Sequence, residues 1–139
     1  MTWQIDESLP GADEFVRLRE RVGWGAVDRA VAQRALSQSL YSVTVRDGDT
    51  LVGMGRVIGD NALYYYVQDV AVDPAWQGRG VGLAVMAAIE GYLAESVPVG
   101  SCVGLLAAEG KEAFYTPFGY TRRDGLPLGH GMSKVMQPA

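Results

Sequence analysis

The chain has 139 residues, 48% of them hydrophobic and 20% charged, and its net charge is −4. A chain of this length can bury its own core, so folding requires neither disulfides nor a structural metal. Lys and Arg form no run longer than two residues, which argues against nucleic-acid binding. The single cysteine, Cys102, and the single histidine, His130, exclude an internal disulfide and a Cys/His zinc site.

No part of the sequence predicts a membrane segment. The least charged stretch, residues 97–108, contains Pro98 and Gly100 and is shorter than the ~20 residues that a transmembrane helix needs. The first residues lack the basic and then apolar pattern of a secretory signal. We therefore expect one cytoplasmic domain over residues 1–139, without a metal.

In chain order, helices are predicted before most of the strands. Two amphipathic helices flank Gly23-Trp24-Gly25, and period-two alternation then indicates three antiparallel strands joined by turns rich in Asp and Gly. The expected ranges are 2–6 for a first strand, 13–22 and 26–40 for the helices, and 41–46, 51–58 and 62–72 for the meander. The pattern then becomes helical again, which predicts a crossover back to the sheet.

The second half of the chain completes a β-α-β unit. A helix is expected over 80–95, a strand over 99–107 and a short helix over 111–118, with extended pieces after residue 120. Helices, an antiparallel meander and then a parallel crossover together predict an α+β domain with a mixed sheet.

The strongest functional signal is the glycine-rich segment Gln77-Gly78-Arg79-Gly80-Val81-Gly82. It follows a predicted strand and begins a predicted helix, whose N-terminus offers free N–H groups and a positive dipole end. Such a turn suits an anion, a pyrophosphate in particular. The spacing fits neither a Walker loop nor a dinucleotide fingerprint. A glycine-rich turn without a ligand is the alternative.

These residues resemble the GCN5-related N-acetyltransferase (GNAT) family. Gln77, Gly80 and Gly82 match the family pattern Arg/Gln-x-x-Gly-x-Gly/Ala, and a later aromatic signature appears as Phe114-Tyr115 with Gly119-Tyr120. The resemblance covers most of the chain. It implies a GNAT fold, with a mixed sheet of six to seven strands flanked by about four helices.

The resemblance also implies acetyl-CoA as the acyl donor and direct attack by an amine in a ternary complex. Loop amides would hold the CoA pyrophosphate, the open edge of the strand at 62–72 would pair with pantetheine, and an N–H at or near Val70 would polarise the thioester carbonyl. The residues expected to contact the cofactor are Val70, Ala71, Val72, Gln77, Gly78, Arg79, Gly80, Val81, Gly82 and Lys111.

Two residues are expected to handle protons. Tyr115 occupies the family position that protonates the departing thiolate, and an unperturbed phenol is protonated at neutral pH. Asp69, on a strand rich in Tyr and Val, is the first candidate for the base that deprotonates the amine, with a paired buried carboxylate as the alternative. Glu109, His130 and a water chain remain further candidates for this base.

For the acceptor we expect a small primary amine, because aromatic and acidic residues should line its cleft. These residues are Trp24, Tyr64, Tyr66 and Glu109. Glu109 also stands where the family commonly has an Asn that touches the cofactor. A protein lysine as acceptor and a non-catalytic acyl-CoA-binding domain remain the alternatives. A homodimer paired through the C-terminal strands is compatible with the sequence.

Overall fold

The computed structural model describes residues 2–139 and divides the chain into two compact units. The first ends at Leu106 and the second is Ala107–Ala139, and each is described by itself. The expectation of a single domain over residues 1–139 stays a prediction. Within residues 2–139, no helix has the length and apolar character needed to cross a bilayer.

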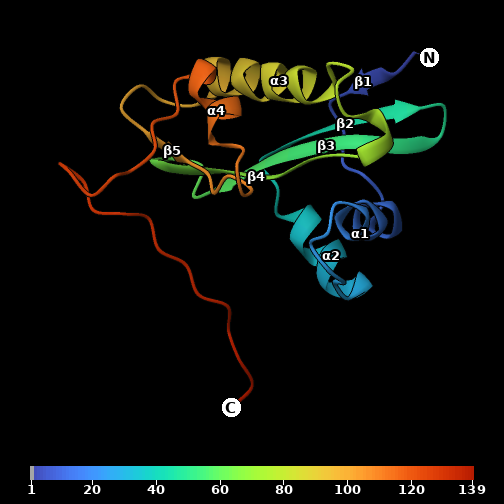
Figure 1. Ribbon diagram of the computed structural model, residues 1–139, viewed down its shortest axis with the longest axis horizontal. Coiled ribbons are helices and arrows are strands. Elements are labelled where there is room, and N and C mark those ends of the chain that lie inside the picture. The colour runs from blue at the N-terminus through green and yellow to red at the C-terminus, as the bar shows by residue number, and fades with distance from the viewer. Residues whose placement is uncertain (1) are drawn as a thin grey trace. The chain divides into compact units, whose positions relative to one another are not determined.

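The first unit contains a five-stranded sheet in the order β1-β2-β3-β4-β5 (Figure 1). The strands are β1 (Gln4–Asp6), β2 (Tyr41–Asp47), β3 (Thr50–Gly59), β4 (Tyr64–Val72) and β5 (Cys102–Gly104). β1 to β4 form an antiparallel meander, and β5 pairs with β4 in parallel. The predicted mixed sheet and its β-α-β crossover are confirmed.

The predicted count of six to seven strands is too high for residues 2–139. The strand expected at 99–107 is only three residues long, and residues 119–139 form no strand. Gly100 has a left-handed φ of +95°, so the chain is still turning just before β5. The tail holds four glycines and few β-branched residues, a composition that does not favour strands.

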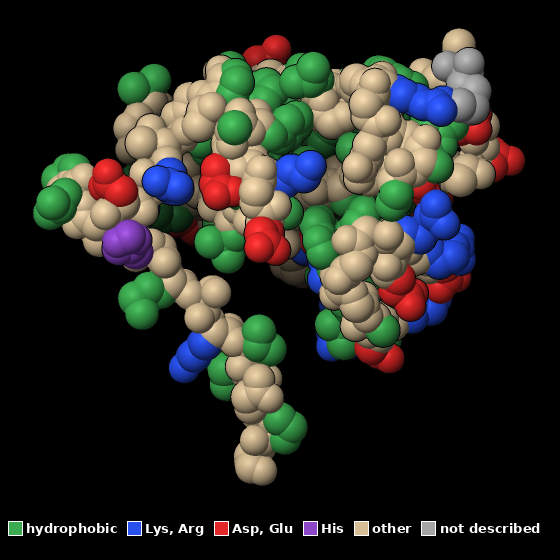
Figure 2. Space-filling view, in the orientation of Figure 1, with side chains coloured by type: hydrophobic (Ala, Val, Ile, Leu, Met, Phe, Trp, Pro, Cys, Tyr) green, Lys and Arg blue, Asp and Glu red, His purple; other side chains and the backbone are tan. Residues whose placement is uncertain are grey.

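Helices cover both faces of the sheet (Figure 1). α1 (Ala12–Arg21) and α2 (Arg29–Ser37) lie on one face, and α3 (Val81–Ser96) lies on the other. α2 begins three residues later than predicted because the Asp28 carboxylate caps it, accepting bonds from the N–H groups of Ala30 and Val31. Figure 2 shows charges of both signs mixed over α1 and α2.

Two small residues on β3 bring α3 close to the sheet. A Cβ at Gly53 would lie 2.5 Å from Val81 Cγ1, and one at Gly55 would lie 2.7 Å from Val85 Cγ1. Both distances are below van der Waals contact, so only glycine fits while the helix sits at this depth. Val81 and Val85 are fully buried there, and the packing fixes the N-terminal end of α3.

Aromatic side chains pack together over residues 114–120 of the second unit. It contains α4 (Glu112–Tyr115) and the 3-10 helix η2 (Thr116–Phe118). The Phe114 ring packs edge-on against the rings of Tyr115 and Phe118, at centroid distances of 4.9 and 5.9 Å. Tyr115 in turn meets Tyr120 at 6.3 Å. The aromatic signature in the sequence is thus a local packing cluster.

Candidate active site

Side-chain hydrogen bonds hold the segment between β4 and α3 in place. The Gln77 side-chain amide donates to the Val72 carbonyl at 3.1 Å, which ties the loop to the end of β4. Asp73 caps the 3-10 helix η1 (Pro74–Trp76) and accepts two bonds from Arg21, at 2.6 and 2.9 Å. The Arg21 guanidinium holds the pKa of the Asp73 carboxyl below its usual value. The loop is therefore fixed to α1 as well as to β4.

Gly78 and Gly80 give this loop its shape. Their φ angles are +79° and +81°, in the left-handed region that side chains other than glycine rarely adopt. A Cβ at either position would meet no protein atom within 4 Å, in contrast to Gly53. The glycines are thus needed for conformation, and the space beside them is open to a ligand.

The N-terminus of α3 presents N–H groups beside this open space. Its cap residue is Gly80, which has no side chain to satisfy these donors, and the first turn holds no acidic residue. Arg79 lies over the Trp76 ring at 4.9 Å, and its carbonyl accepts a bond from the Trp3 indole at 3.3 Å. The dipole, the uncapped amides and a nearby guanidinium together favour a bound anion.

The second half of β4 offers an open edge. β5 pairs only with the first three residues of β4, Tyr64–Tyr66. No strand within residues 2–139 pairs with that edge beyond Tyr66. The peptide groups of Val70, Ala71 and Val72 follow on this stretch. An extended ligand that carries amides and ends in a diphosphate would fit this edge and the adjoining loop.

A β-bulge interrupts β4 on this stretch. Met54 pairs with Ala71 and Arg56 with Gln68, so that Asp69 and Val70 both stand opposite Gly55. Asp69 has a left-handed φ of +56°. The extra residue shifts the alternation of side chains by one, and it turns its own peptide group out of the ladder. A bulge of this kind aims a backbone group at a neighbouring site.

Asp69 is buried, with 4% of its surface exposed, and it pairs with two guanidinium groups. Arg56 Nε donates to Oδ2 at 2.8 Å, Arg19 Nη1 donates to Oδ1, and the Gln68 amide also reaches Oδ1 at 3.3 Å. This geometry favours the alternative of a paired buried carboxylate over the general base. Sequence reasoning missed both arginines, although Arg56 within a strand of Val and Met residues signals a buried partner.

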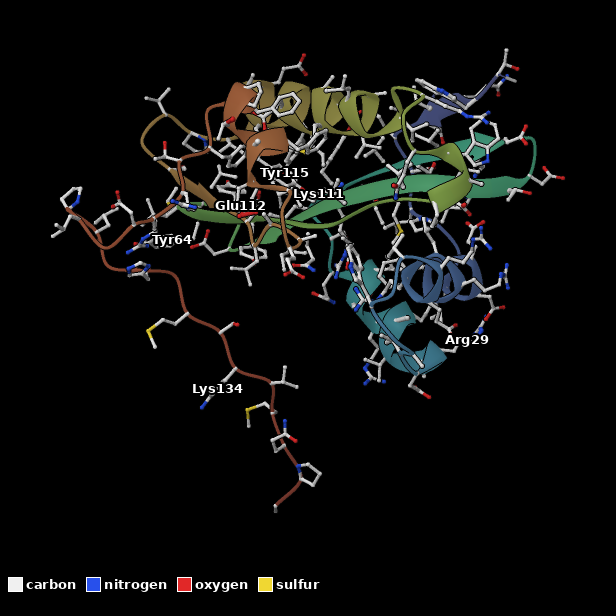
Figure 3. The ribbon with its side chains drawn as sticks, in the orientation of Figure 1. Arg29, Tyr64, Lys111, Glu112, Tyr115 and Lys134 are labelled. Atoms are coloured by element: carbon white, nitrogen blue, oxygen red, sulfur yellow. The ribbon has the colours of Figure 1, made fainter. Side chains whose placement is uncertain are left out.

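The aromatic residues expected at the acceptor site have different exposures. Trp24 is 37% exposed and lies against the Arg19 guanidinium at 5.3 Å. Tyr64, at the start of β4 and labelled in Figure 3, is 61% exposed. Its neighbour Tyr65 is buried. Tyr66 is half-buried, and burial raises the pKa of its phenol. Trp24 and Tyr64 are thus accessible to a ligand, and Tyr65 belongs to the core.

The other candidates belong to the second unit. Tyr115 ends α4 and Lys111 precedes it, as Figure 3 shows. Burial raises the pKa of the Tyr115 phenol, so it stays protonated at neutral pH. Glu109, Lys111 and His130 are exposed. Within residues 2–139, no group of three or more His, Cys, Asp or Glu residues could hold a metal ion.

Known proteins share this fold. A family model described as an acetyltransferase (GNAT) domain matches residues 37–122. A probable acetyltransferase of unknown function from Staphylococcus aureus is 29% identical, with a TM-score of 0.89 over 97% of this chain and 100% of that one. A GNAT-family acetyltransferase from Streptococcus pneumoniae is 27% identical, with a TM-score of 0.78 over 99% and 100%.

An uncharacterised ycf52-like N-acetyltransferase from Prochlorococcus marinus is 32% identical over 114 residues. The match covers 78% of this chain but 61% of that protein, so the chain spans about three fifths of this curated relative. The fold and the glycine loop define a domain of the acetyltransferase class. The chain belongs to the GNAT family, because the family model matches more than half of it.

Proposed function

We propose that the protein is an acetyl-CoA-dependent N-acetyltransferase that acts on the primary amine of a small molecule. One observation carries the proposal: a left-handed glycine loop, an uncapped helix N-terminus and an open strand edge adjoin one another. This arrangement suits a diphosphate joined to an extended, amide-bearing arm, which is the chemistry of coenzyme A. The names of the relatives agree with it.

The residues of the loop and of β4 would bind acetyl-CoA, the acyl donor. Backbone N–H groups from Gln77 to Gly82 would bind the pyrophosphate, with Arg79 adding positive charge. The peptide groups of Val70, Ala71 and Val72 would pair with pantetheine. Lys111 would reach a phosphate. When bound, acetyl-CoA supplies the thioester carbonyl carbon that the amine attacks.

The chain's own groups would then manage charge and protons. The N–H at or near Val70 would stabilise negative charge on the carbonyl oxygen, a contribution of about 3–4 kcal/mol in enzymes with such a donor. As the new C–N bond forms and the C–S bond breaks, Tyr115 would give its proton to the sulfur. The proton lost by the amine would pass to Glu109, His130 or a water chain.

The acceptor would lie near Trp24 and Tyr64, which combine exposure with aromatic surface. We further propose a cytoplasmic homodimer that associates through the second unit. Five large apolar side chains of its tail are at least 61% exposed: Leu126, Leu128, Met132, Val135 and Met136. Association through this segment would bury these side chains. Sedimentation should then give the mass of two chains.

The test is release of free thiol from acetyl-CoA with a panel of small amines, amino acids, sugar phosphates and lysine peptides. We expect release with small amines. Release with lysine peptides alone would favour a protein lysine acetyltransferase. Calorimetric binding of acetyl-CoA without turnover would favour a non-catalytic acyl-CoA-binding domain. Absence of binding would contradict the whole proposal.

Two matched glycine variants test whether the loop binds acetyl-CoA. Gly80→Ala places a Cβ in the open space and strains a left-handed position, whereas Gly91→Ala lies on α3 with no atom within 4 Å of its Cβ and no positive φ. We expect weaker acetyl-CoA binding from Gly80→Ala and unchanged binding from Gly91→Ala. Equal binding by both variants would contradict the role of the loop.

A further inference from the structure

We propose that Asp69 is a positioning residue, which Arg19 and Arg56 clamp so that the β4 bulge keeps its shape at the site of acetyl transfer. The catalytic consequence rests on the proposed function. The structural claim does not, because it concerns only the backbone of β4 and its ion pairs.

The backbone of Asp69 is in a conformation that needs support. A φ of +56° brings Cβ close to the carbonyl oxygen, and residues with side chains rarely adopt it within a strand. Such positions persist only where the surroundings over-determine them. In an ordinary extended conformation, residue 69 would join the ladder and the bulge would be lost.

Two guanidinium groups from different elements hold the side chain. Arg56 of β3 donates to Oδ2 at 2.8 Å, and Arg19 of α1 donates to Oδ1. Both contacts are sheltered from water, because the Asp69 side chain is 2% exposed and those of Arg56 and Arg19 are 10% and 20% exposed. Rotation of Asp69 to an extended φ would swing the carboxylate away from both partners.

Each arginine is itself fixed. Arg56 Nη1 also donates to the Ala35 carbonyl at 3.1 Å and to the Ser39 hydroxyl at 3.2 Å, at the C-terminal end of α2. The Arg19 guanidinium lies between the rings of Phe15 and Trp24, at 5.7 and 5.3 Å. The carboxylate is thus tied to α1, α2 and β3 together.

The clamp acts directly beside the proposed oxyanion donor. Val70 follows Asp69 and faces α3, because its Cγ2 lies 3.5 Å from the position of a Cβ on Gly55, next to Val85 and Ile89. Loss of the bulge would move every residue after it by one step and send each of their side chains to the opposite face. The N–H at Val70 would then return to the ladder.

The same contacts argue against proton abstraction by Asp69. A general base needs a lone pair directed at the amine, and it must accept a proton readily. Both oxygens of Asp69 already accept bonds from cationic donors inside the protein. With 2% of its side chain exposed, the carboxylate is also out of reach of an amine at the protein surface.

The experiment compares three replacements that separate the clamp from backbone tolerance. Asp69→Asn keeps a side-chain oxygen and tolerance of positive φ, Asp69→Gly keeps only that tolerance, and Asp69→Ala keeps neither. Glu14→Gln is the control, because it removes a carboxylate that pairs with Arg46 through two bonds away from β4. NMR couplings would report φ at residue 69, and amide hydrogen exchange would report the bulge.

We expect positive φ and an intact bulge in the Asn variant, whose amide oxygen can still accept from a guanidinium, and loss of the bulge in the Gly and Ala variants. The control should leave residue 69 unchanged. If the Asp69 variants do not fold, Arg19→Met keeps Arg56 on the carboxylate, and amide exchange at Val70 should then fall about tenfold or more, because its N–H returns to the ladder as the bulge is lost. A bulge intact in Asp69→Gly or in Asp69→Ala, or exchange unchanged in Arg19→Met, would overturn the proposal.

Kinetics separate positioning from proton abstraction. We expect Asp69→Ala to lose about a hundredfold in kcat, comparable to removal of an oxyanion donor, and Asp69→Asn to lose about tenfold or less with an unchanged pH profile. Equal large losses in Asn and Ala, with the bulge intact in Asn, would overturn the positioning role. If the native protein transfers no acetyl group, only the proposed function fails, and the NMR measurement still decides the clamp.

Discussion

Replacement of Gly53 by Ala tests the close packing that places the N-terminus of α3. The new Cβ would lie 2.5 Å from Val81 Cγ1, so the two groups must separate by about 1 Å to reach normal contact. Val81 is 1% exposed and is the first residue of α3. The strain therefore acts on the part of the helix that adjoins the glycine loop.

The magnitude follows from two opposing terms. Overpacking of a close-packed core costs about 1–3 kcal/mol. Replacing a strand glycine lowers the entropy of the unfolded chain and returns about 0.5–1 kcal/mol. The two ranges leave a net loss for Gly53→Ala between about 0 and 2.5 kcal/mol, centred near 1 kcal/mol, and urea unfolding measures it as a lower midpoint at constant slope.

A double-mutant cycle with Val81→Ala identifies the cause. Val81→Ala alone should destabilise the protein through lost burial, but it removes the methyl group that Gly53→Ala meets. The double variant should thus be more stable than the sum of the single effects predicts, by about 0.5 kcal/mol or more. Additive effects would refute the packing argument.

Three further predictions concern charge, protonation and the loop. Asp73→Asn should lose stability at neutral pH, and its difference in stability from the native protein should shrink in acid. The pKa of Asp73 is lower in the folded protein than its unfolded value near 4, so its ion pair stabilises the fold above that value and stops doing so as the pH falls through the folded pKa. Acid and urea titrations of both proteins would show this, and a pH-independent difference would exclude the Arg21 pair as its source. Tyr115→Phe should slow turnover. In the native protein, deprotonation of Tyr115 should lower the rate only above pH 10, because burial raises the pKa of this phenol. An unchanged rate profile in the variant would remove Tyr115 as the donor. Gly80→Ala should cost about 1–2 kcal/mol of stability from its left-handed φ alone, and thermal unfolding at unchanged Tm would contradict this.

Sequence patterns predicted the features that depend on residues close together in the chain. Alternation placed the meander within one or two residues of its observed strands, and the glycine spacing placed the loop at the start of α3. The aromatic signature at Phe114 and Tyr115 lies on α4, as expected. In each case the determining contacts span a turn or a single strand, which periodicity can detect.

The ion-pair cluster behind the bulge depends on contacts that no local pattern encodes. Arg19 and Asp69 are 50 residues apart, and Arg56 is 13 residues from Asp69. The sequence identified the carboxylate as unusual, but its partners became visible only when α1 and β3 were packed against β4. The left-handed φ of Asp69 was also unforeseen, since Asp in a strand pattern does not normally signal a bulge.

The open stretch of β4 also affects how readily the protein aggregates. From Val67 to Val72, a row of peptide groups has no partner strand on the β5 side, within the part of the chain that the structure describes. Unprotected edges of this kind act as templates for strands of other molecules, which leads to aggregation. A ligand that pairs with these groups would block this route. Storage with coenzyme A should thus slow precipitation of concentrated samples.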